Sequence, residues 1–312
     1  MKKGILELNR RTFMQGLGSL VAAIALHPDT LPVLAAPAIT RPVPATGARL
    51  PVIGMGSSRT FDVENDPVAR ERCVQVLRNF FDYGGAIIDS SPMYGGSEQV
   101  IGYCLQQVDN RQSLFTATKV WMLGRQFGIN QMEHSERLWG VGRLDLMQIH
   151  NMLDWDTHLE TLRKWKEEGR IRYIGITTSH GRRHEKLEQI LSSGPFDFVQ
   201  FSYNILDREV EQRLLPLAAE QGIAVIVNRP FRCGELFNYS EGKPLPEWAP
   251  EFDCGNWAQF FLKFIVSHPD VTCVIPATSR VDHMQENMGA GFGRLPDAQA
   301  RQRMIRYFEN LI

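Results

Sequence analysis

The chain has 312 residues, of which 43% are hydrophobic and 22% are charged, and its formal net charge is -1 at pH 7. This composition is typical of a globular protein, and the length can bury a large core, either as one barrel or as two smaller domains. Because no basic stripe appears and the charge is nearly balanced, we do not expect nucleic acid as a partner.

The N-terminus has the order of a secretory signal peptide. Basic residues come first, an apolar run over 16–26 follows, and small residues cluster near the end of the segment. That run is too short to span a bilayer, which needs about 20 apolar residues. Residues 9–14, NRRTFM, also carry the adjacent arginines of a bacterial twin-arginine signal. We predict that residues 1–38 direct export to the bacterial periplasm through the twin-arginine machinery, without a stable membrane anchor. The alternative is an amphipathic helix or a disordered leader.

A proline-rich stretch over 28–45 is predicted to be an extended linker. Beyond it, short apolar runs alternate with helical patterns. Strands are predicted over Val52–Met55, Ala86–Asp89, Leu114–Lys119, Leu144–His150, Tyr173–Thr177, Phe198–Phe201, Ala224–Asn228 and Cys273–Pro276. Because strands that alternate with helices pair in parallel, we predict an α/β protein with a single (β/α)₈ TIM barrel over 39–312.

The helices between these strands have clear boundaries. In the helix predicted over 156–168, Asp156 stands at the start and Gly169 follows the end. A second helix is predicted over 209–221. The competing fold is an open doubly wound sheet, but its G-x-G-x-x-G fingerprint is incomplete in Gly54–Arg59.

Four chemically active side chains stand at the ends of three successive predicted strands. Asp89, Lys119 and His150 end the second, third and fourth strands, and Tyr94 lies in the loop after Asp89. In a barrel the C-terminal strand ends form one rim, and active sites lie there. We therefore expect these four residues, here called the tetrad, to lie together.

The tetrad is suited to proton transfer. A free tyrosine has a pKa of about 10, and a neighbouring ammonium such as Lys119 is expected to lower it. Asp89 supplies the counter-ion that a buried lysine needs, and His150 can orient a carbonyl oxygen or relay a proton. Tyr94 is then the general acid for a developing alkoxide. Since no protein group delivers a hydride, a nicotinamide cofactor is expected.

From Leu50 to the C-terminus the chain resembles a known family, the aldo/keto reductases. The matching segments are IIDSSPMYGGSEQVIG (87–102), DLMQIHN (145–151), GRIRYIGIT (169–177), VQFSYNILDR (199–208) and IPATSRVDHMQEN (275–287). The resemblance implies that hydride from NAD(P)H reduces an aldehyde or ketone. It assigns Tyr94 as proton donor, with Asp89, Lys119 and His150 completing the tetrad.

The resemblance also implies a cofactor site. Its expected members are Gly56, Ser57, Thr177, Thr178, Gln200, Pro230, Phe231, Thr278, Arg280, Glu286 and Asn287. Many family members have a tyrosine that stacks on nicotinamide where this chain has Asn228. Phe231 or Tyr203 is expected to provide an aromatic face instead.

The expected cofactor is NADP(H) in preference to NAD(H). The family often has Lys-Ser where this chain has Ala277-Thr278, and an arginine where it has His283. Those basic groups bind the 2′-phosphate of NADPH, and Arg280 can replace them because a guanidinium binds phosphate bidentately. The five cysteines show no zinc-type spacing, so no metal is expected.

Phe61, Trp121 and Met152 are expected to line an apolar mouth that accepts a small-molecule carbonyl substrate. Two other functions stay open. A nicotinamide-nucleotide-binding regulatory or subunit protein of the same fold would explain the altered cofactor contacts. A lyase or isomerase would use Lys119 as a Schiff-base amine, but Asp89 keeps that amine charged and less nucleophilic.

Overall fold

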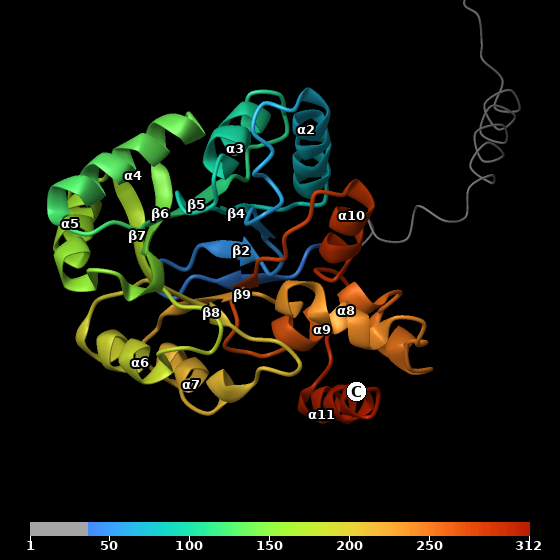
Figure 1. Cartoon of the computed structure of the whole chain (residues 1–312). Helices are drawn as coiled ribbons and strands as arrows, with labels where there is room; N and C mark the ends of the chain where they lie inside the picture. The colour runs from blue at the N-terminus through green and yellow to red at the C-terminus, as the bar shows by residue number, and fades with distance from the viewer. Residues whose placement is uncertain (1–36) are drawn as a thin grey trace, which may run out of the picture. The chain divides into compact units, whose positions relative to one another are not determined.

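The structure is a computed structural model that describes residues 37–312 (Figure 1). Residues Ala38–Ile312 form one compact unit. Nearly all of the predicted signal segment, 1–38, lies outside the described residues, so export stays a prediction. Within 37–312, every helix is too short or too polar to cross a bilayer.

A parallel sheet of eight strands forms the centre of this unit. The strands are β3 (Met55–Gly56), β4 (Ile87–Asp89), β5 (Phe115–Val120), β6 (Leu144–Ile149), β7 (Ile171–Thr177), β8 (Phe198–Ser202), β9 (Ala224–Asn228) and β10 (Cys273–Val274). Neighbours in sequence are neighbours in the sheet. Parallel bridges from Ile53 to Val274 and from Gly56 to Ala277 join the first strand to the last. All eight predicted strands and the closed barrel are therefore confirmed.

The helices surround the strands in Figure 1. They are α2 (Pro67–Asp82), α3 (Ser97–Leu105), α4 (Arg125–Trp139), α5 (Trp155–Glu167), α6 (His184–Ser193), α7 (Leu214–Glu220), α8 (Glu235–Ser240), α9 (Trp257–Val266), α10 (Val281–Gly289) and α11 (Ala298–Glu309). Short 3₁₀ turns lie at His150–Met152, Glu209–Glu211, Arg232–Gly234 and Ala249–Phe252. One apolar core fills the space between helices and sheet, and a second lies inside the barrel.

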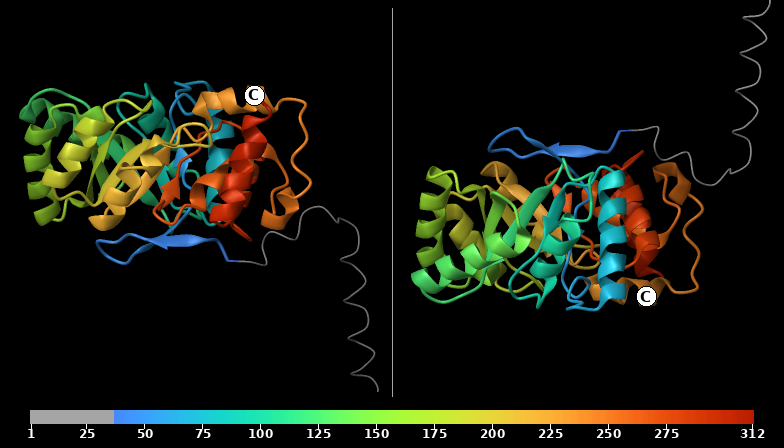
Figure 2. Two further views of the ribbon diagram at one scale, coloured as in Figure 1. Left: turned by 90° about the horizontal axis from the view of Figure 1, so that it is seen from below. Right: turned by 90° about the horizontal axis from the view of Figure 1, so that it is seen from above.

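An antiparallel hairpin precedes the barrel and lies across one end of it (Figure 2). Its strands are β1 (Thr40–Pro42) and β2 (Arg49–Pro51). Val43 and Leu50 of the hairpin belong to the apolar core inside the barrel, so the hairpin closes that end. The prediction of an extended linker over 28–45 is thus wrong for its described part, because burial of Val43 fixes this segment against the barrel.

Candidate active site

The polar side chains of the site point into the barrel at its open end, because each stands two positions beyond an interior apolar residue of its strand. Ile87 and Ala117 belong to the apolar core inside the barrel, and two positions further along their strands stand Asp89 and Lys119. Successive side chains of a strand alternate between faces, so these two groups also point inward. The same step leads from interior residues of β6, β8 and β9 to Gln148, Gln200 and Asn228.

The structure brings the four tetrad residues together. Lys119 Nζ lies 2.5 Å from Asp89 Oδ1 and donates a second hydrogen bond, 2.7 Å long, to the carbonyl oxygen of Ser90. It also lies 5.2 Å from the centre of the Tyr94 ring. The rings of Tyr94 and His150 meet edge to face, with their centres 5.9 Å apart. The predicted convergence at one rim is therefore present.

Two glutamines complete the surroundings of Asp89. Gln148 Nε2 donates to Asp89 Oδ2 at 2.8 Å, and Gln200 Nε2 donates to the same oxygen at 3.0 Å. Both carboxylate oxygens are thereby occupied, one by Lys119 and the other by two amides. Gln148 was not among the predicted site residues. The signal for it was available, since it stands two positions before His150, which directly follows the strand.

Burial determines the protonation of Tyr94. It raises the pKa of the phenol above its ordinary value, and the opposing effect of the Lys119 ammonium is smaller. Lys119 does lower the pKa of Tyr94, as expected, but burial outweighs it and the net shift is upward. Because the phenol stays protonated at neutral pH, it keeps the proton that it would donate to an alkoxide.

Lys119 and His150 are both buried, but Lys119 stays charged whereas His150 stays neutral. Burial would lower the pKa of Lys119, but the charge of Asp89 and its hydrogen bond raise it above its ordinary value, so the amine is charged. For His150, burial and then the Lys119 charge lower the pKa to about 3. Its imidazole is neutral at physiological pH, and Nδ1 lies 2.9 Å from the hydroxyl of Ser91.

The tetrad borders a cavity of about 730 Å³ at the open end of the barrel. This volume is in the range of small-molecule and cofactor sites. Asp89, Tyr94 and His150 line it. The predicted cofactor residues that also line it are Gly56, Ser57, Thr177, Thr178, Gln200, Pro230 and Phe231.

The remaining predicted cofactor residues lie outside this cavity, on the segment that contains β10 and α10. Thr278 and Asn287 are buried, and Glu286 is half-buried. The guanidinium of Arg280 is held by Asp282, with Nε 3.0 Å from Oδ1. The predicted cofactor residues therefore form two groups. The inner group lines the cavity, and the outer group lies on the segment that contains β10 and α10.

The three residues predicted to form an apolar mouth do not line the cavity in the structure. Phe61 and Met152 are packed in the core between helices and sheet, and Trp121, though exposed, does not line the cavity. Met152 has φ 58° in the 3₁₀ turn that follows β6, a conformation that directs the chain away from an ordinary helix or strand. Polar and charged residues also line the cavity, among them Ser179, His180, Arg59 and Arg229.

Asn228 is a hydrogen-bonded part of the cavity wall. Its Nδ2 donates to Thr178 O at 3.0 Å and to Gln200 Oε1 at 3.3 Å, and its Oδ1 accepts from Ser202 Oγ at 2.7 Å. Of the two aromatic residues expected to replace the missing tyrosine, Tyr203 is buried away from the cavity. Phe231 lines it.

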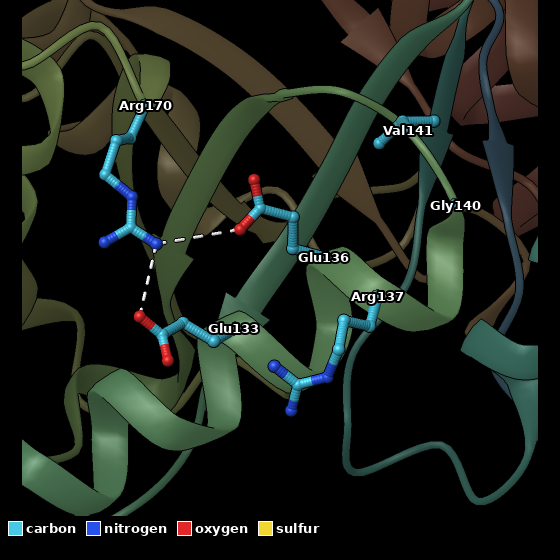
Figure 3. A pocket seen from close by; sticks show the side chains of 6 residues that line it. All are labelled: Glu133, Glu136, Arg137, Gly140, Val141 and Arg170. Atoms are coloured by element: carbon cyan, nitrogen blue, oxygen red, sulfur yellow. Dashed lines mark hydrogen bonds and ion pairs between the residues drawn. The ribbon is translucent and has the colours of Figure 1, made fainter.

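A second hollow, of about 340 Å³, lies on the outer surface of the barrel (Figure 3). Arg170 Nη2 lies 3.3 Å from Glu133 Oε1 and 3.7 Å from Glu136 Oε2, and the guanidinium stacks on Trp165. Because these charges compensate one another, the hollow is a surface ion-pair cluster that joins α4 to the start of β7. Among residues 37–312, no three His, Cys, Asp or Glu side chains gather as metal ligands.

Comparisons with known proteins give a consistent result. The model of the aldo/keto reductase family matches residues 52–303. Methylglyoxal reductase YeaE of Escherichia coli is 28% identical, over 76% of this chain and 84% of its own. The aldo-keto reductase yakc [NADP(+)] of Schizosaccharomyces pombe is 25% identical, over 81% and 87%. The NADH-specific methylglyoxal reductase of E. coli is 24% identical, over 76% and 87%.

The fold has solved counterparts. The holo form of an aldo-keto reductase from Bacillus halodurans superposes with a TM-score of 0.72 at 22% identity, covering 87% of this chain and 96% of that one. A Klebsiella pneumoniae aldo/keto reductase in complex with NADP and acetate gives 0.68 at 22% identity, over 84% and 93%. At this level of identity the likeness concerns the fold.

Proposed function

The chain belongs to the aldo/keto reductase family, and we propose that it reduces a small carbonyl compound with NADP(H) after export to the bacterial periplasm. NAD(P)H-dependent carbonyl reduction is the activity of its relatives and of this chain. The observation that supports the chemistry is the tetrad: a protonated phenol beside a charged amine and a neutral imidazole, in the wall of one cavity.

Each tetrad residue has a part in the proton transfer. The Tyr94 hydroxyl donates its proton to the carbonyl oxygen as negative charge develops there. The Lys119 ammonium stabilises the phenolate that remains, and Asp89 holds that ammonium at 2.5 Å. His150, neutral and paired with Ser91, orients the carbonyl oxygen by hydrogen bonding. The nicotinamide cofactor supplies the hydride when it is bound.

The cavity wall fits the nicotinamide end of such a cofactor. Thr177, Thr178 and Gln200 present hydroxyl and amide groups that match a carboxamide. Asn228 offers no ring, so Phe231 is the aromatic candidate in the wall. We assign NADP(H) because the Arg280 guanidinium, which is now bound to Asp282, can bind a 2′-phosphate in place of that carboxylate. Relatives are named for either nucleotide, so this assignment rests on the chain's own residues.

The test is Tyr94→Phe with NADPH and a simple aldehyde. We expect a loss of turnover of at least about 100-fold, because the proton donor is gone. NADPH binding, followed by fluorescence quenching, should be unchanged. Tyr103→Phe, at an exposed tyrosine on α3, is the matched control. Full activity of Tyr94→Phe would contradict the tetrad assignment. A wild-type protein that retains the cofactor without turning over aldehydes would favour the alternative role as a nucleotide-binding subunit.

Export is proposed from the sequence of the first 38 residues. The order of basic, apolar and small residues supports a signal peptide, and Arg10-Arg11 supports the twin-arginine route. That route carries folded proteins, which suits an enzyme that needs a bound nucleotide.

A further inference from the structure

Two arginines and a histidine from three loops line the mouth of the cavity. Arg59 follows β3, His180 follows β7 and Arg229 follows β9, and all three line the same cavity as Tyr94 and His150. In the closed sheet only β10 separates β3 from β9. The two guanidinium groups therefore come from loops on the same part of the rim.

Arg229 is fixed by His180. Its Nη1 lies 2.6 Å from His180 Nε2. A guanidinium is only a donor, so Nε2 accepts, the imidazole is neutral, and its Nδ1–H donates to Ser179 Oγ at 2.7 Å. Burial, and then the charges of Arg229, Arg182 and Arg59, lower the pKa of His180, which agrees with this state. His180 therefore serves as a neutral support for a charged group.

The backbone holds these three residues in an unusual conformation. The φ angles of Arg59, His180 and Arg229 are 65°, 66° and 51°. Residues other than glycine rarely adopt positive φ, and where they do, the surrounding structure imposes it. The loops therefore fix the backbone positions from which these three side chains extend.

The two arginines have no acidic partner. Among residues 37–312, no carboxylate oxygen lies within 4.0 Å of the side-chain nitrogens of Arg59 or Arg229. Arg232, in the same loop as Arg229, does have acidic partners. Its Nε lies 3.2 Å from Asp207 Oδ2, and its Nη1 lies 3.4 Å from Glu235 Oε1. The positive charge at the mouth is thus specific to the cavity side of these loops.

The acids of the cavity do not cancel this charge. Asp89 is paired with Lys119 at 2.5 Å. Asp62 lines the cavity and accepts the backbone N–H of Gly96 at 2.8 Å, beside the loop that carries Tyr94. Neither contacts Arg59 or Arg229. An anionic ligand would therefore find two guanidinium groups without a competing carboxylate.

The direction of Arg229 separates it from the outer cofactor residues. In the sheet the order is β10, β9, β8, β7, and Arg229 reaches from the end of β9 past β8 to His180 after β7. The predicted outer cofactor residues lie on the other side, with β10 and α10. We propose that Arg229 and Arg59 bind the carboxylate of an anionic carbonyl substrate while Tyr94 protonates its carbonyl oxygen.

This inference rests on the proposed reductase function and names its substrate class: aldehydes or ketones that carry a carboxylate. A guanidinium pairs with a carboxylate through two parallel hydrogen bonds, so recognition is by geometry as well as charge. His180 is a positioning residue for Arg229. Its replacement should raise KM for the acid by a larger factor than KM for a neutral aldehyde.

The first experiment compares 4-carboxybenzaldehyde with its neutral methyl ester, methyl 4-formylbenzoate, with NADPH as reductant. We expect the wild type to prefer the acid in kcat/KM by about 10- to 100-fold, the effect of a charged hydrogen bond. Arg229→Gln and Arg59→Gln should each reduce that ratio, and His180→Phe should raise KM for the acid by a larger factor than KM for the ester. Arg232→Gln, whose arginine is already neutralised, is the control and should keep the ratio.

Two results would overturn the inference. One is a wild-type enzyme that does not prefer the acid. The other is a pair of variants, Arg229→Gln and Arg59→Gln, in which KM for NADPH rises while the acid-to-ester ratio stays constant. In that case the arginines hold the pyrophosphate of the dinucleotide. Using two separate arginine variants keeps the test decisive if one of them fails to fold.

A binding measurement separates this inference from the proposed function. Benzoate and benzamide are titrated into the NADPH-loaded wild type and into Arg229→Gln by calorimetry. We expect benzoate to bind at least about tenfold more tightly than benzamide to the wild type only. If this preference appears while no aldehyde is reduced, the reductase function fails and the anion site remains. Equal binding of both compounds contradicts the anion site, whatever the turnover.

Discussion

At the scale of single residues, the chemistry depends on how the Asp89 carboxylate is held. Lys119 occupies one oxygen, and Gln148 and Gln200 share the other. This arrangement keeps the acid oriented toward the amine that lies beside the Tyr94 ring. The amides therefore influence proton transfer without touching the substrate.

Replacing Gln148 by leucine should lower kcat by about tenfold, because one of the two charge-assisted hydrogen bonds to Asp89 Oδ2 is lost. KM for NADPH should change little, since Gln148 does not line the cavity. Steady-state kinetics measure both constants. Gln126→Leu, on the exposed side of α4, is the control, and an unchanged kcat in Gln148→Leu would show that Gln200 suffices.

The pH dependence should be flat between about pH 5 and 8 for a neutral substrate. His150 has a pKa of about 3 and is already neutral across that window. Tyr94 has a raised pKa and is still protonated, so reduction should fall only at alkaline pH, as the phenol loses its proton. The profile of kcat/KM for methyl 4-formylbenzoate measures this. An inflection near the ordinary histidine pKa would contradict it.

The same pKa of His150 has a consequence for stability. Its value is lower in the folded protein than in the unfolded chain, so the unfolded chain binds a proton first as pH falls. The neutral form of His150 therefore contributes its full stabilisation above about pH 6.5, the ordinary histidine pKa. That stabilisation is lost progressively as the pH falls toward about 3.

The tetrad could be predicted from the sequence because each member stands at or just after the end of an apolar run. Gln148 was missed because one polar residue inside a buried strand resembles any satisfied core amide. The pairing of Arg229 with His180 could not be predicted, since it depends on the positive φ angles of two loops. Phe61 and Met152 were assigned to the mouth on their type alone, and apolar type indicates the core equally well.

At the scale of elements, helix boundaries depended on local chemistry. The helix expected over 209–221 is divided into a 3₁₀ turn and α7, which begins at Leu214. Pro216 has no N–H to offer the preceding turn, so it is tolerated in the first turn of α7 but not in the middle of one long helix. In α5 the N-cap is Asp154, whose carboxylate accepts the N–H of Gly124 at 2.7 Å, and Asp156 lies in the first turn.

Helix α9 carries a buried lysine that joins two loops. Lys263 Nζ donates to the carbonyl oxygens of Phe252, Phe292 and Arg294 at 2.7, 2.6 and 3.1 Å. Lys263→Met keeps the volume but leaves three carbonyl oxygens without this donor. We expect the free energy of unfolding to fall by about 3 kcal/mol.

Urea denaturation followed by circular dichroism measures that loss. Lys243→Met removes an exposed lysine and should cost less than about 0.5 kcal/mol. Equal stability of the two variants would mean that water replaces the ammonium of Lys263.

At the scale of the whole molecule, the barrel was predictable because eight apolar runs recur with helices between them. The hairpin was not, because the prolines around it suggested a linker. Prolines are tolerated there since β1 and β2 form a two-stranded ribbon in which each strand keeps a free edge. What fixes the hairpin is burial of Val43 and Leu50 in a core that belongs to the whole barrel.

Export also belongs to this scale, because it concerns the complete chain. The double variant Arg10→Lys/Arg11→Lys, expressed in a bacterium with twin-arginine machinery, should remain in the cytoplasm, whereas the wild type should reach the periplasm. Cell fractionation and immunoblotting measure the distribution. Arg49→Lys is the control outside the segment, and periplasmic delivery of the double variant at wild-type levels would contradict the proposed route.

The closed end of the barrel has a kinetic consequence. Since the hairpin seals one end, both ligands reach the tetrad through the mouth. The residues expected to hold nicotinamide lie at the strand ends, whereas Arg59, His180 and Arg229 lie further out in the loops. If nicotinamide occupies the deeper position, it has to bind before the carbonyl compound. We therefore expect product-inhibition kinetics to show a compulsory order, in which the spent nucleotide leaves after the alcohol.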